Sequence, residues 1–170
     1  MTHQLMQHLD ITPSGLGLLG AGFFISYAAM QLPAGLLLER FGARKALSLA
    51  SALCSVGLFL FAHTQSFWVA FLARSIMGVT AAFSFISAIF LINRWASNTW
   101  FAPLTGVVQL TGAVGSILGL APVARMLQQG SWQQAINSIA WIALVLSLIF
   151  FTLIRDGHPP RSTQTLPKDK

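Results

Sequence analysis

The sequence predicts an all-α polytopic membrane protein, a single bundle of five transmembrane helices. Only 8% of its 170 residues are charged, whereas 55% are hydrophobic, which is far from the composition of soluble proteins. At about 20 residues a span, a chain of this length supplies five crossings with short connections. The basic residues stand at the ends of apolar runs and form no single patch, so the net charge of +6 indicates membrane anchoring and argues against nucleic acid as a partner.

The expected elements follow in order along the chain. Residues 1–13 form a polar lead on the outer side, and Thr12, Pro13 and Ser14 mark a helix start. Residues 14–154 hold the transmembrane bundle, with spans at about 14–38, 46–61, 67–92, 101–123 and 132–154. Residues 155–170 are polar and contain three prolines, so we expect a disordered cytoplasmic tail.

The first two spans differ in the side chains that they carry. Four glycines crowd residues 15–22 of the first span, and in a membrane such small residues let another helix approach closely. The second span has few polar side chains beyond Ser48, Ser51 and Ser55. We therefore expect the second span to face lipid over much of its surface.

A dense cluster of charge and glycine separates these two spans. From Gly35 to Lys45 the chain reads Gly-Leu-Leu-Leu-Glu-Arg-Phe-Gly-Ala-Arg-Lys. Because apolar runs stand on both sides, the cluster must be a tight polar turn between two helices. With this turn inside, the inner segments hold eight basic residues and the outer segments only Arg125, which places the N-terminus outside and the C-terminus in the cytoplasm, in the plasma (inner) membrane.

Arg74 is the only charge within an expected span. An arginine there costs about 2.5 to 3.5 kcal/mol on insertion scales, so it needs a partner. The four acids of the chain all lie in loops or tails: Asp10, Glu39, Asp156 and Asp169. The remaining partners are backbone carbonyls, an acid on a further helix or an anionic substrate. The last of these makes Arg74 the candidate substrate-binding residue.

Glycines also mark the expected packing surfaces of later spans. Gly112, Gly115 and Gly119 are spaced by three and four residues, so they lie near one helix face and form a strip for close helix packing. Gly78, one turn after Arg74, is expected to pack in the same way.

The polar turn resembles a motif of major facilitator superfamily transporters, Gly-x-x-x-Asp-Arg-x-Gly-x-Arg-Lys, which joins their second and third helices. Glu39 stands where that family usually has Asp. The other positions match residue for residue: Gly35, Arg40, Gly42, Arg44 and Lys45. In the family, the acid of this turn caps a helix of the opposite half and favours the outward-open state. The resemblance therefore implies that these six residues form a conformational switch.

A second segment is similar to a motif in the fourth helix of the same family, Arg-x-x-Gln-Gly-x-Gly-Ala-Ala. Residues 74–82 match it at Arg74, Gly78 and the two alanines that follow, and depart from it at Met77 and Thr80. The resemblance runs from about residue 4 to 155 and makes the five spans equivalent to helices two to six of a twelve-helix transporter. We therefore expect this chain to lack the first helix and the second half of such a transporter. It would then be a fragment, a sequence with a misplaced start or one part of a split transporter.

The resemblance implies a partial secondary active transporter for a small, anionic solute, with a proton or another ion as coupling partner. In the family, the first and fourth helices line the substrate path between the two halves. The alternative is a non-transporting assembly or regulatory partner in the membrane, derived from a transporter half. Self-association or capture by a complementary half is expected in either case. The sequence shows no catalytic constellation, metal-ligand spacing or phosphate loop, so we expect no enzyme activity, metal or cofactor.

Overall fold

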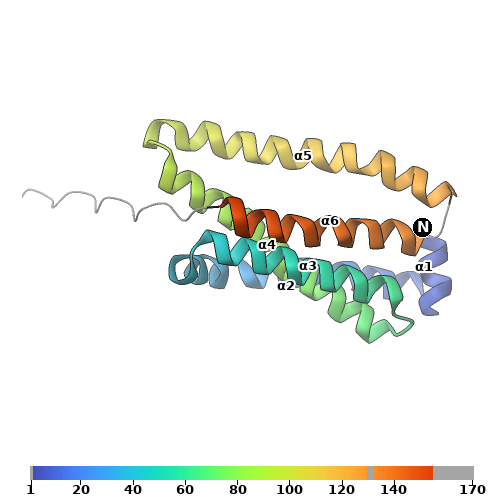
Figure 1. Cartoon of the computed structure of the whole chain (residues 1–170). Helices are drawn as coiled ribbons and strands as arrows, with labels where there is room; N and C mark the ends of the chain where they lie inside the picture. Colours follow the sequence, from blue (N-terminus) through green and yellow to red (C-terminus); the bar gives the residue numbers. More distant parts are fainter. Residues whose placement is uncertain (1, 130–131, 155–170) are drawn as a thin grey trace, which may run out of the picture.

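The computed structural model describes residues 2–129 and 132–154, apart from the side chains of residues 2–4, 7, 98 and 120–129. These residues form the helices α1 (Thr2–Leu9), α2 (Pro13–Phe41), α3 (Ala43–His63), α4 (Phe67–Trp95), α5 (Asn98–Gln129) and α6 (Trp132–Leu153) (Figure 1). Five of them, α2 to α6, are long and apolar enough to cross a membrane. The predicted all-α membrane fold is thereby confirmed. The tail at 155–170 lies outside the described residues.

Most helices run further than the expected spans. α2 continues to Phe41, α4 to Trp95 and α5 to Gln129, so Arg125, expected in an outer loop, lies on helical backbone. The inner connection expected at residues 96–100 shrinks to Ala96 and Ser97. The physical reason is that the headgroup layers extend the membrane well beyond its hydrocarbon core, so polar helix ends remain solvated there and need not unwind.

Four of the long helices pack together, and the fifth lies apart. α2 packs along α4, whereas α3 packs along both α4 and α6. α5 makes only sparse contacts with α4 and α6, and its ribbon runs along one side of the bundle at a distance from α6 (Figure 1). No residue in the most apolar stretch of α5 is buried.

A single residue, Gly42, separates α2 from α3. Its φ of 80° lies in the left-handed region, which glycine adopts without the steric cost that a side chain brings. The Gly42 N–H donates to the Leu38 carbonyl at 2.9 Å and so closes the C-terminus of α2. This geometry confirms the predicted tight turn and explains the second glycine of the motif.

Glycines allow α2 and α4 to cross closely. A Cβ added at Gly78 of α4 would overlap the backbone carbonyl of Phe23 on α2. A Cβ at Gly22 of α2 would come within 2.6 Å of the Phe71 ring on α4. Because no side chain stands between the two backbones at Gly78, the helices gain van der Waals contact along their crossing.

α3, the helix that we expected to face lipid over much of its surface, packs against both α4 and α6. Among the five spans its apolar stretch has the largest buried share, 39%. Its face toward α6 carries hydrogen bonds in both directions: Ser55 Oγ donates to the Ala140 carbonyl at 2.8 Å, and Ser147 Oγ of α6 donates to the Ser48 carbonyl at 2.7 Å. Most of this stretch is nevertheless not buried, and Leu49, Leu53 and Val56 are exposed on it, so a large lipid-facing surface stays a prediction. The sequence did not predict that serines on this otherwise apolar helix join it to another helix.

The polar lead also contains a helix that the sequence analysis did not predict. α1 buries Leu5 and Leu9, one turn apart, in a core cluster with Phe61 and Trp132. His8 Nε2 lies 3.2 Å from the Thr64 carbonyl, and the His8 ring meets Trp132 edge-on at 5.3 Å. α1 thus covers one end of the bundle.

The start of α2 agrees with the sequence. Thr12 is the N-cap, since its side-chain oxygen accepts a hydrogen bond from the Gly15 N–H at 3.4 Å, and Pro13 is the first helical residue. Between α1 and this cap, Asp10 turns the chain with a φ of 48°. The predicted helix start is confirmed.

Candidate functional site

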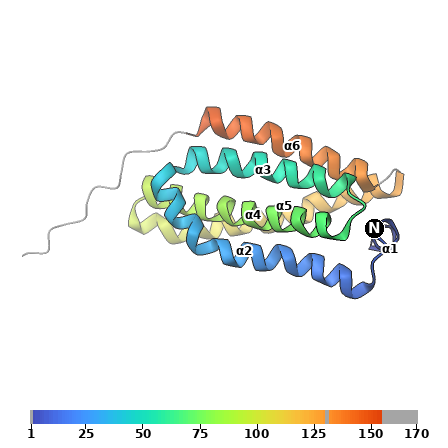
Figure 2. The same cartoon turned by 90° about the horizontal axis from the view of Figure 1, so that it is seen from below.

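The two groups of predicted site residues lie at opposite ends of the bundle. We call the end with the Gly42 turn and the α4–α5 connection the motif end, and the end with α1 and the α3–α4 connection the α1 end (Figure 2). α3 has 21 residues and is about 30 Å long. Arg44 stands near its start, whereas Phe61, on which Arg74 stacks, stands near its end. The structure therefore keeps the polar turn and Arg74 apart.

At the motif end, Arg44 joins the beginning of α3 to the end of α6. Its Nε donates to the Phe151 carbonyl at 2.6 Å, and its guanidinium lies 4.5 Å from the centre of the Phe151 ring. Carbonyls in the last turn of a helix lack partners within the helix and carry the negative end of its dipole. Arg44 is therefore a structural clamp between two spans.

The other charged residues of the turn are exposed. Glu39 makes no ion pair with the described part of the chain, and the Arg40 guanidinium lies 5.7 Å from the centre of the neighbouring Phe41 ring. Gly35 is one turn before Glu39, and a Cβ added there would meet no atom within 4 Å. Gly35 and Glu39 thus present an open face of α2, with a carboxylate where another helix could end.

Arg74 lies about two turns after the start of α4 at Phe67, halfway between the α1 end of this helix and its middle. Its guanidinium stacks on the buried Phe61 ring, 4.7 Å from the ring centre, and its Nε is buried without a hydrogen-bond partner. Within the described residues it makes no ion pair. An Arg side chain on a helix points toward the helix N-terminus, here the α1 end, so the long stem lowers the cost of the charge.

Thr80, one of the departures from the fourth-helix motif, is accommodated within α4. Its hydroxyl donates to the Met77 carbonyl at 2.9 Å, and its side chain is buried. The motif therefore keeps its close-packing glycine, Gly78, while a threonine with a satisfied hydroxyl takes the place of the next glycine.

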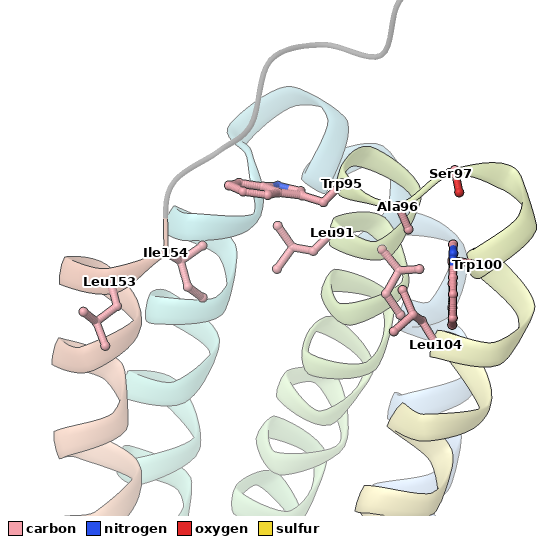
Figure 3. A pocket seen from close by; sticks show the side chains of 9 residues that line it. Leu91, Trp95, Ala96, Ser97, Trp100, Leu104, Leu153 and Ile154 are labelled. Carbon is pink, nitrogen blue, oxygen red and sulfur yellow. The ribbon is translucent and has the colours of Figure 1, made fainter.

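A cavity of about 660 Å³ lies at the motif end between α4, α5 and α6. Figure 3 shows Trp95 and Leu91 on α4 and Trp100 and Leu104 on α5, with Leu153 and Ile154 at the end of α6. The lining is mostly apolar but includes Ser97, and Arg74 does not contribute to it. Among the described residues, no three His, Cys, Asp or Glu side chains gather where they could hold a metal ion.

The glycine strip of α5 faces open space. Cβ atoms added at Gly112, Gly115 and Gly119 would meet no atom within 4 Å, whereas one at Gly78 would meet backbone. Within the described part of the chain, the strip therefore packs against nothing.

Sequence reasoning missed the contacts that hold α3 to α6. Ser48 and Ser55 are seven residues apart, which places both on one face of a helix. This spacing could have indicated a polar face that contacts another helix. The pairing of the Ser55 hydroxyl with a carbonyl of α6 had no such signal, because it depends on which helix lies opposite.

Comparisons with known proteins agree with this arrangement. A family model described as Major Facilitator Superfamily matches residues 1–170. The chain is 29% identical over 152 residues to a quinolone resistance transporter of Acinetobacter baumannii, covering 82% of this chain and 34% of the relative. It is 22% identical over 161 residues to a probable sulfoacetate transporter of Cupriavidus necator, covering 95% and 37%.

A plant relative extends the range of similar proteins. The chain is 26% identical over 153 residues to probable anion transporter 5 of Arabidopsis thaliana, covering 89% of this chain and 35% of the relative. The chain thus spans about a third of the length of these three relatives. With the family model matching from end to end and five helices able to cross a membrane, the chain belongs to the Major Facilitator Superfamily as a multi-pass membrane protein.

Proposed function

We propose that the chain is part of a secondary active transporter that moves a small solute across the membrane. The observation that carries this proposal is the family match over the whole chain, together with relatives that are named as transporters of chemically different solutes. A proton or another ion is the proposed coupling partner.

The packing of the helices supports a need for further partners. α4 packs on both α2 and α3, and α6 packs on α3, whereas α5 makes only sparse contacts with α4 and α6. In each half of these transporters, two three-helix repeats are related by inverted symmetry. Applied here, that symmetry sets a further helix against α5 and α6, beside the 660 Å³ cavity. We propose that a complementary segment, a complementary half or a second copy covers this face.

The open face at Gly35 and Glu39 supports a switching role for the polar turn. A carboxylate next to a helix N-terminus gains about 0.3 to 1 kcal/mol from free N–H groups and the helix dipole. Gly35 leaves room for such a helix end to approach. Glu39 would thus hold the two halves together in one state of the transport cycle and release them in the other, with Arg44 keeping the turn fixed to α6.

For the substrate we propose a small anion, with Arg74 as the residue that recognises it. A buried Nε without a partner is shared by Arg74 and Arg94, but only Arg74 lies well inside a span with no paired acid among the described residues, and this combination supports the role. Two relatives are named for anions, sulfoacetate and anions in general. A structural role competes with it: the stack on Phe61 already holds the guanidinium, and a carbonyl or acid of a further helix would complete its bonds.

The motif end is proposed to face the cytoplasm of the plasma (inner) membrane. Among the described residues it gathers Arg40, Arg44, Lys45 and Arg94, which the positive-inside rule places on that side. The N-terminus is then outside and the C-terminus inside. Reporter fusions in the Ala96–Ser97 and Thr64–Ser66 connections should read opposite sides, with the first in the cytoplasm.

The test is uptake of small anions by liposomes that contain the purified chain, with its molecular size measured in the same preparation. Alternating access needs two bundles that rock around one site, so we expect the chain alone to form oligomers without uptake. Adding a complementary transporter half should give saturable uptake. Saturable uptake by a monomer would contradict the need for a second bundle. A partner half that binds tightly and gives no uptake would favour the non-transporting alternative.

Variants at Arg74 then separate substrate recognition from structure. Arg74→Gln should weaken anion uptake while the protein still inserts, and Arg74→Lys should restore little, because lysine lacks the planar two-pronged grip on a carboxylate. Arg94→Gln is the control, since Arg94 also stacks on a phenylalanine, Phe90, but at the motif end. Full uptake by the Gln variant would remove Arg74 from the site.

A further inference from the structure

A second cavity opens on the side of the bundle, away from α5 and α6. This cavity, which we call the α2–α3 groove, has a volume of about 370 Å³ and runs between α2, α3 and α4 from the motif end toward mid-membrane. Its lining consists of Leu37, Phe41, Lys45, Ala46, Leu49, Ala50, Leu53, Val79, Thr80 and Phe83.

The groove follows from the way the chain turns at Gly42. α2 and α3 are joined by one residue yet make few contacts beyond the turn, because α4 packs against both of them from behind. Ala46 and Ala50 are small and one turn apart on α3, so they give the groove its depth. Leu49 and Leu53, exposed on the same helix, form its rim. From Lys45 to Leu53 the groove extends about 12 Å along α3.

The groove suits hydrocarbon and not water. Thr80 is its only hydroxyl-bearing residue, and that hydroxyl already donates to the Met77 carbonyl. Apart from Lys45, the rest of the lining is aliphatic or aromatic. A bilayer core holds no water that could fill such a space, so an acyl chain is the occupant that matches the walls.

Positive charge is concentrated at the mouth of the groove. Lys45 lines the mouth and is exposed, and the Arg40 guanidinium lies over the ring of Phe41, another lining residue, at 5.7 Å. Arg44 is turned away toward α6. Glu39 is exposed in the same turn of α2 but does not line the groove. Two cations therefore stand where the acyl region gives way to headgroups.

We propose that the α2–α3 groove binds an anionic phospholipid, with one acyl chain between α2 and α3 and the phosphate between Lys45 and Arg40. Cations at a membrane surface attract anionic lipids, and each contributes about five-fold in affinity. The site needs only that the motif end lies at a membrane interface, so it does not depend on the solute or on transport.

The test is native mass spectrometry of the full chain released from detergent, titrated with phosphatidylglycerol or with phosphatidylcholine of the same acyl chains. The spectra count bound lipids and show the oligomeric state together. We expect one phosphatidylglycerol to bind the chain at least about five-fold more tightly than phosphatidylcholine.

Matched variants assign the site. Lys45→Gln should lower the affinity for phosphatidylglycerol about five-fold and leave the affinity for phosphatidylcholine unchanged. Leu49→Trp should weaken both lipids, because the indole fills the groove from an exposed position. Arg94→Gln also removes one positive charge at the motif end, and Leu110→Trp also puts an indole at an exposed leucine position. Both are controls outside the groove and should bind lipid as the parent chain does.

The outcomes decide between occupants. Equal binding of the two lipids by the parent chain, or a Lys45→Gln variant that keeps the full preference, would overturn the proposal. A dimer that is lost in Leu49→Trp while lipid binding is unaffected would also overturn it, because a second copy of the chain would then occupy the groove.

Discussion

α3 and α5 are both long apolar helices, yet their surroundings are opposite. In the most apolar stretch of α3, 39% of the residues are buried, and in that of α5 none are. Both helices carry small and hydroxyl-bearing residues, so composition does not separate them. The difference is that α3 lies between α4 and α6, whereas α5 has no comparable neighbour in the described chain.

Hydroxyl groups on the two helices show the same contrast. Ser55 of α3 donates to a carbonyl of α6, whereas Ser116 of α5 donates to Gly112, one turn back on its own helix. A serine bonded within its helix is satisfied in lipid, and one bonded across helices fixes their register. Serine therefore stabilises helix packing in α3 and does not contribute to it in α5.

The largest expected effect comes from adding one methyl group at a close crossing. Gly78→Ala should destabilise the bundle by about 1 to 3 kcal/mol, because the new Cβ meets backbone on α2 that cannot move aside. Gly22→Ala should cost less, since the Phe71 ring that it meets can rotate. Unfolding of the purified chain in mixed micelles measures both.

The control for this prediction is Gly112→Ala on α5, where the added methyl meets nothing within 4 Å. It should leave the unfolding free energy unchanged or raise it slightly, because alanine favours a helix more than glycine does. Equal losses at Gly78 and Gly112 would show that α5 is packed as closely as α4.

These glycines also show how far the sequence could predict the structure. The turn at Gly42, the N-cap at Thr12 and the number of spans follow from local patterns, since each depends on backbone geometry or on segment length. The polar turn follows from its motif, but the contact of Arg44 with Phe151 depends on where α6 lies. Spacing alone could not distinguish Gly78, which meets α2, from Gly115, which meets no described residue.

The helix α1 and the contact of Arg74 with Phe61 could not be predicted from the sequence, for a related reason. An eight-residue helix is marginal by itself and forms because Leu5 and Leu9 reach a cluster built from α2, α3, α4 and α6. Arg74 stood out as a charge in a span, but its contact with Phe61 depends on the packing of α3 against α4. Tertiary contacts of this kind leave little trace in a single sequence.

A smaller effect is expected from the hydrogen bonds between α3 and α6. Ser55→Ala and Ser147→Ala should each cost about 0.6 kcal/mol and at most about 1.7, the range for such bonds between membrane helices. Ser116→Ala, the matched change on α5, should cost nothing measurable because its bond lies within one helix. Unfolding midpoints of the three variants in the same micelles provide the comparison, and a loss at Ser116 as large as at Ser55 would contradict it.

The smallest effect in the chain by itself is expected at Gly115, and it should change sign in a larger assembly. Gly115→Ala adds a methyl group in open space, so the unfolding free energy of the isolated chain should stay the same or rise slightly, as for Gly112→Ala. If a further helix packs on the α5 strip as α2 packs on Gly78, the same methyl group should cost about 1 to 3 kcal/mol once a complementary half is bound. Measurements of the unfolding free energy and of the affinity between the two halves test this prediction. Gly17→Ala on α2, where an added Cβ also meets no atom within 4 Å, separates a general effect of added methyl groups from one specific to α5. An unchanged affinity for Gly115→Ala would mean that the strip faces lipid in the assembly as well.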